Sequence, residues 1–95
     1  MATLSDDDIR AALDGLPGWD LVGAAIVKEF RLGGFAGAIT FVVRLSYEAQ
    51  AADHHPDLDI RYDRVRVTLS THSEGGVTSK DLDLARAIEA VAPAH

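Results

Sequence analysis

The chain has 95 residues, of which 47% are hydrophobic and 25% charged, so we expect a single globular domain over residues 1–95. Fifteen acidic and nine basic residues give a formal net charge of −6, which disfavours direct binding to nucleic acid. Because there is no cysteine and no apolar run of ~18 residues, disulfides, thiolate metal sites and a membrane span are excluded, and we expect a cytoplasmic protein.

The first third of the chain predicts a helix followed by a hairpin. Ser5 can cap a helix whose apolar residues recur at helical spacing until Pro17 ends it. Over residues 18–32, two β-type runs flank a turn near Gly23, a pattern typical of a β-hairpin. We interpret Trp19, in the first of these runs, as a core aromatic.

A long helix is predicted over residues 35–52, where apolar residues recur at spacings of three and four. The predicted apolar stripe consists of Phe35, Ala38, Ile39, Val42, Leu45, Ala49 and Ala52. Phe41 and Val43 lie off this stripe, so the helix is apolar on a second side as well. We therefore expect the sheet to cover one side and a second subunit to cover the other.

Alternating apolar and polar residues predict a second hairpin, with strands at residues 58–62 and 65–69. We interpret Tyr62 as a core aromatic.

A loop then leads to a helix that Thr78 and Asp81 open as a capping box. The order α-ββ-α-ββ-α predicts an α+β fold, a two-layer sandwich in which three helices cover one face of a four-stranded antiparallel sheet.

Three of the four histidines are candidates for acid–base chemistry. His54 and His55 are adjacent, and Pro56 disfavours helical dihedrals at His55, so the backbone is expected to turn there. His72 follows the last strand, and the second hairpin would bring it toward the pair. Three imidazoles in one cleft, with Asp81 beside them, would supply groups that exchange protons near neutral pH.

Other interpretations of these residues stay open. Two adjacent histidines are more often part of a surface loop, and His72 alone is more often a strand-end residue. A three-histidine zinc site is a further alternative. It ranks below the others because no HExxH spacing is present and adjacent histidines rarely bind one ion in good geometry. Asp81 is also an acid in the first turn of a helix, where the dipole favours it regardless of function.

Several motifs resemble the pterin-4a-carbinolamine dehydratase family. They are DHHP at 53–56, Tyr62, VTLSTH at 67–72, VTSKDLDLARAIE at 77–89 and the segment GWDLVGAAIVKEFRLGGFAGAITFVVRL at 18–45. The likeness covers about residues 4–92. It implies a lyase that dehydrates 4a-hydroxytetrahydropterin to quinonoid dihydropterin, which recycles the pterin of aromatic amino acid hydroxylases without a metal or a cofactor.

The resemblance also implies roles for individual residues. His54 and His72 would be the acid–base groups, and His55 would bind and orient the substrate. Further residues expected to line the pterin site are Pro56, Ser70, Thr71 and Asp81. Gln50 joins this set at a position where the family usually has an acid, and Leu58 replaces a frequent tryptophan. Glutamine keeps the hydrogen bond but loses the charge, so we expect activity at a reduced level.

The family likeness further implies a homodimer or homotetramer built on the edge strands and the long helix. Family members can also act without catalysis, by stabilising a homeodomain transcription factor dimer or within a Rubisco assembly factor. The alternative function is therefore a dimerisation or assembly partner that retains the pterin site as a relic. Such a scaffold would depend on the surface of the long helix and not on the histidines.

Overall fold

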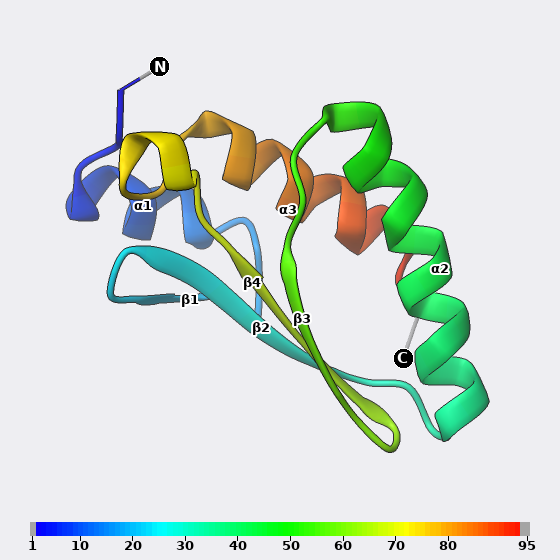
Figure 1. The fold of residues 1–95 in the computed structure, drawn as a ribbon. Coiled ribbons are helices and arrows are strands. Elements are labelled where there is room, and N and C mark those ends of the chain that lie inside the picture. The colour runs from blue at the N-terminus through cyan, green and yellow to red at the C-terminus, as the bar shows by residue number, and fades with distance from the viewer. Residues whose placement is uncertain (1, 94–95) are drawn as a thin grey trace.

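The computed structural model describes residues 2–93, which form an α+β fold in the order predicted from the sequence. The helices are α1 (Asp6–Leu13), α2 (Phe35–Ala52) and α3 (Ser79–Val91), with a 3-10 helix η1 (His72–Glu74) before α3. The strands are β1 (Asp20–Val22), β2 (Ala25–Arg31), β3 (Asp57–Arg61) and β4 (Arg64–Leu69). The predicted fold of three helices and a four-stranded antiparallel sheet is confirmed (Figure 1).

The order of strands in the sheet is β1-β2-β4-β3, so β2 and β4 are central and β1 and β3 form the edges. All neighbouring strands pair antiparallel. In the second hairpin Asp57 is opposite Thr68, which places the start of β3 beside the end of β4. The segment that carries His54 and His55 and the segment that carries His72 therefore leave the sheet at the same end.

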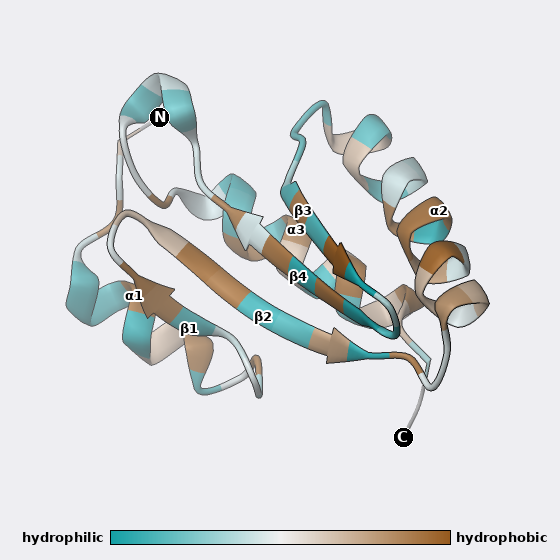
Figure 2. Cartoon of the chain, turned by 60° about the horizontal axis from the view of Figure 1, so that its bottom comes forward, coloured by the Kyte–Doolittle hydropathy of each residue, from teal (hydrophilic) through white to brown (hydrophobic). Residues whose placement is uncertain are grey.

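One face of the sheet forms the core together with the helices. Alternate residues of β4 are buried while Arg64 and Arg66 between them are exposed, as expected for a sheet covered on one side only. Figure 2 shows apolar segments along β2 and β4. The largest fully buried apolar side chains are Phe41, Ile26, Leu45, Leu69, Leu84, Ile88, Val65 and Val67. Each contributes about 1.5–3 kcal/mol of burial free energy.

The core-facing side of α2 includes Ala38, Leu45 and Ala49 of the predicted stripe but differs from it at the aromatic residues. Phe41 is 1% exposed and packs against Phe30, with ring centroids 4.7 Å apart, whereas Phe35 is 55% exposed. The prediction that Phe41 lies away from the core was wrong. A helix that is apolar nearly all round has no unique core face in its own sequence, and here the aromatic ring on β2 selects it. Val43 is 48% exposed, on the outer side as predicted.

Of the two aromatic residues predicted to lie in the core, Trp19 is buried and Tyr62 is exposed. Trp19 is buried, and its Nε1–H donates to Glu89 Oε1 at 2.9 Å, which links the start of the first hairpin to the end of α3. Lys28 forms an ion pair with the same carboxylate. Tyr62 is 72% exposed, so its interpretation as a core residue was wrong. It lies in the turn between β3 and β4 with φ 53°, and a turn residue points away from the sheet's core.

Candidate active site

The C-terminus of α2 places the first histidine. Asp53 has φ 49° and ψ 43°, a left-handed conformation, and its N–H bonds to Gln50 O. The N–H of His54 then bonds back to Ala49 O at 3.1 Å. These two bonds form the Schellman motif, which ends a helix and turns the chain sharply. The turn that Pro56 was expected to supply is therefore made at Asp53, one residue before the histidine pair.

His54 is held by a buried carboxylate. Its Nε2 lies 2.5 Å from Oδ1 of Asp81, and the side chains of the two residues are 11% and 0% exposed respectively. A buried carboxylate is costly unless its oxygens are paired. Asp81 therefore fixes the orientation of the imidazole, and it does so from the first turn of α3 across 27 positions of sequence.

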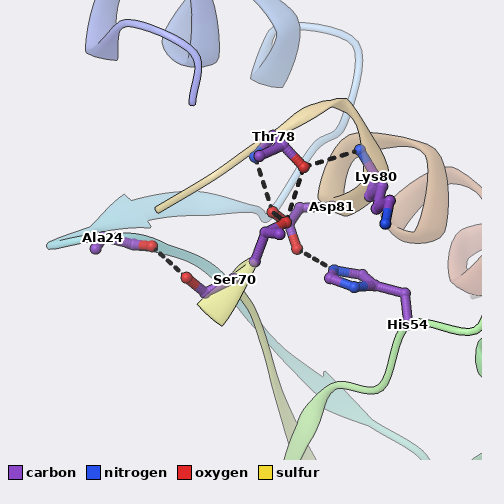
Figure 3. A network of polar contacts seen from close by, with 7 residues as sticks. Ala24, His54, Ser70, Thr78, Lys80 and Asp81 are labelled. Atoms are coloured by element: carbon purple, nitrogen blue, oxygen red, sulfur yellow. Dashed lines mark hydrogen bonds and ion pairs between the residues drawn. The ribbon is translucent and has the colours of Figure 1, made fainter. Parts of the chain in front are cut away.

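The remaining contacts of Asp81 come from the helix cap and the end of the sheet (Figure 3). Its Oδ2 accepts from the N–H of Thr78 at 2.9 Å and from the hydroxyl of Thr71 at 2.8 Å. Thr78 and Asp81 form the capping box that the sequence predicted. Thr71 follows β4, pairs with Gly76 across the loop and is 4% exposed. Three segments of the chain therefore meet at one carboxylate.

The second histidine contacts a different partner. His55 is exposed, and its Nε2 lies 3.3 Å from Oε1 of Gln50, one turn back on α2. Pro56 beside it is partly buried. Ser70 donates its hydroxyl proton to the carbonyl oxygen of Ala24 at 2.7 Å, so this hydroxyl ties β4 to the first hairpin. These residues lie around the His54–Asp81 pair without a hydrogen bond to it in residues 2–93.

His72 is the first residue of η1 and is exposed. Its ring has no hydrogen-bond partner in the described part of the chain, but its neighbour Thr71 donates to Asp81. The structure therefore brings His54, Thr71 and Asp81 into contact and leaves His72 one residue away from that network. A single cleft shared by all three histidines stays a prediction.

A hollow of about 220 Å³ lies between α2 and α3 next to His54. Its other lining residues are Glu48, Ala52, Lys80, Asp83, Leu84 and Ala87. His54 is therefore both fixed by Asp81 and accessible from a cavity, as a proton-transfer group must be. The sequence did not indicate this hollow, because its walls come from two helices whose relative placement is set by the fold.

Two residues have roles at the site that the sequence did not indicate. Asp53 belongs to the DHHP motif, and its role in ending α2 could have been found because aspartate is one of the few residues that adopt a left-handed conformation at a helix end. Thr78 was identified as a helix cap, but its hydroxyl also contacts that of Thr71 at 2.8 Å. Only the fold brings the two threonines together.

Residues 2–93 contain no group of three or more histidine, cysteine, aspartate or glutamate side chains arranged to hold a metal ion. In the same residues no helix has both the length and the apolar character needed to cross a bilayer.

Comparison with known proteins decides the family. The family described as pterin 4 alpha carbinolamine dehydratase matches residues 2–91. The chain belongs to this family. A protein of Chloroflexus aurantiacus, named provisionally as a pterin-4-alpha-carbinolamine dehydratase, is 48% identical over 96% of this chain and 98% of its own. One of Mycobacteroides abscessus with the same name is 49% identical over 94% and 95%. The predicted resemblance is confirmed.

Solved structures show the same fold. A crystal structure from Brucella melitensis, described as a transcriptional coactivator/pterin dehydratase, matches with a TM-score of 0.91 and 39% identity, over 96% of this chain and 99% of that one. A pterin dehydratase-like protein described as a RuBisCO assembly factor of the alpha-carboxysome matches with a TM-score of 0.66. Its 18% identity, over 81% and 89% of the two chains, shows a shared fold only.

Proposed function

We propose that this protein dehydrates 4a-hydroxytetrahydropterin to quinonoid dihydropterin. Membership of the dehydratase family supports this reaction class. The observation that carries the proposal is the contact between His54 and the fully buried Asp81, next to a hollow. A histidine held by a buried carboxylate is an arrangement suited to proton transfer.

The reaction requires one proton to be supplied and one to be removed. The hydroxyl on the ring carbon leaves as water after it receives a proton, and an adjacent ring N–H loses its proton as the C=N bond forms. We assign these two steps to His54 and His72, and we assign substrate binding and orientation to His55. An imidazole can donate or accept a proton, so no further reactant is needed.

The other residues assigned to the pterin site contribute in different ways. Pro56 and Gln50 flank His55, and the amide of Gln50 orients that ring. Ser70 and Thr71 have their hydroxyl protons engaged by Ala24 O and Asp81. We therefore propose that these two residues shape the site through their backbone. The role of Asp81 is to hold His54.

Stopped-flow measurement on synthetic 4a-carbinolamine tests the function. We expect the protein to accelerate dehydration over buffer, and we expect His54→Ala and His72→Ala each to lower kcat by about 100-fold, the usual contribution of an acid–base group. His95→Ala is the matched control, because His95 lies outside the motif, and its kcat should equal that of the unmodified protein. A rate no better than buffer contradicts the proposal, as does a His72→Ala variant of full activity.

We also propose that the protein forms a homodimer or homotetramer through β3 and α2. All five residues of the edge strand β3 are exposed, including Leu58 at 38% and Ile60 at 37%. Val43 and Tyr47, four residues apart on α2, are 48% and 70% exposed. An unpaired edge with apolar side chains favours pairing with a second copy. The alternative function as an assembly partner would use the same surface and would not need the histidines.

A further inference from the structure

The capping box of α3 has features that capping alone does not require. In a capping box the third helical residue reaches back to the N-cap N–H, an arrangement that does not require either side chain to be buried. Here Thr78 and Asp81 are both 0% exposed. The carboxylate also accepts from Thr71 and contacts His54, neither of which belongs to the helix.

The hydrogen bonds of this network have only one consistent direction. The backbone N–H of Lys80 donates to Oγ1 of Thr78 at 3.3 Å. A carboxylate can only accept, so the hydroxyl of Thr71 donates to Asp81 at 2.8 Å. A hydroxyl has one proton, and Thr71 donates its own to Asp81. The 2.8 Å contact between the two hydroxyls is therefore donated by Thr78 and accepted by Thr71.

The same reasoning fixes the proton on the histidine. Since Oδ1 of Asp81 can only accept, Nε2 of His54 must carry the hydrogen in the 2.5 Å contact. Nδ1 makes no hydrogen bond with any residue from 2 to 93, so it is the nitrogen left to exchange a proton. The charged residues that line the hollow together with His54 are Glu48, Lys80 and Asp83.

We propose that Thr78 and Thr71 are positioning residues that orient Asp81 and thereby hold neutral His54 with its hydrogen on Nε2, so that proton transfer takes place at Nδ1. The hydroxyl of Thr71 and the N–H of Thr78 occupy Oδ2, and the hydroxyl of Thr78 donates to that of Thr71, which leaves Oδ1 for the imidazole. This inference rests on the proposed dehydratase function for its kinetic consequence, but the position of the hydrogen is a property of the free protein.

Nitrogen NMR of the full-length protein, labelled on histidine and free of substrate, tests the hydrogen position directly. We expect neutral His54 to show a protonated Nε2 and an unprotonated Nδ1. In Thr71→Val, an isosteric change that removes the donor to Asp81, we expect the two forms to be mixed. Thr71→Ser, which restores the hydroxyl, should return the spectrum of the unmodified protein. A spectrum with the hydrogen on Nδ1 in the unmodified protein overturns the inference before any variant is made.

Measurements of kcat and KM distinguish a residue that positions Asp81 from one that contacts the substrate. We expect Thr71→Val and Thr78→Val to lower kcat by roughly tenfold, part of the ~10²–10⁴-fold that acid–base catalysis supplies, with KM unchanged. The serine variants should restore kcat. A rise in KM with an unchanged His54 spectrum would show that Thr71 touches the substrate and would overturn the proposal. If the hydrogen lies on Nε2 but no turnover is detected, the dehydratase function fails while the hydrogen position stands.

Discussion

Asp81 accepts hydrogen bonds from the N-cap of α3, from Thr71 after β4 and from His54 before β3, and the last of these lies 27 positions away in sequence. The capping box and the family motif both indicated this residue, so its place at the start of α3 could be predicted. Its burial could not be, because an acid at the first turn of a helix is usually exposed. Only the fold, which brings the three segments together, shows that Asp81 contacts His54.

The first prediction concerns the hydrogen bond between Gln50 and His55. The family usually has an acid at this position, and here the amide contacts His55 at 3.3 Å. We expect Gln50→Glu to raise kcat/KM severalfold, because a carboxylate strengthens the hydrogen bond that orients this ring. Stopped-flow measurement checks it, with Glu29→Gln, at an exposed position of β2, as a control. A value equal to or below that of the unmodified protein contradicts the expectation.

The limits of α2 could be predicted from the sequence and its orientation could not. Glycines before Phe35 mark the observed start of the helix, and its predicted end at Ala52 agrees with the structure, although the Schellman turn at Asp53 and not Pro56 makes that end. Which side faces the core depended on Phe30, a residue of another element. Similarly, Tyr62 continued the alternation of β3, but the hairpin turn begins there and the side chain is exposed.

A second prediction concerns Asp53, the residue at which α2 ends, and the stability of the protein. Asp53 has φ 49°, a region that glycine adopts without the steric cost of a Cβ. We expect Asp53→Gly to raise the free energy of unfolding by about 0.5–1 kcal/mol and Asp53→Val to lower it by at least about 1 kcal/mol, because a β-branched residue is strained there. Urea unfolding followed by circular dichroism measures both.

The same pair of variants tests whether the turn positions His54. Asp53→Val should lower kcat along with stability, because His54 is the next residue and depends on the Schellman turn. Asp53→Gly should keep its activity. If the valine variant is as stable as the glycine variant, the left-handed turn is not what ends the helix.

At the scale of the whole molecule, the exposed apolar residues of β3 and α2 predict self-association. We expect light scattering at micromolar concentration to give the mass of a dimer or tetramer. Ile60→Lys, which places a charge on the edge strand, should shift the protein toward monomer, while Arg10→Glu on the exposed side of α1 should not. A monomer for the unmodified protein contradicts the proposed assembly.

The proposed function of the whole site requires that the three imidazoles act on one bound pterin. Titration of the histidine-labelled protein with 7,8-dihydrobiopterin, followed by NMR, measures this directly. We expect the ring signals of His54, His55 and His72 all to shift along one binding curve while the signal of His95 stays constant. Signals of His72 that stay constant while those of His54 move would contradict it.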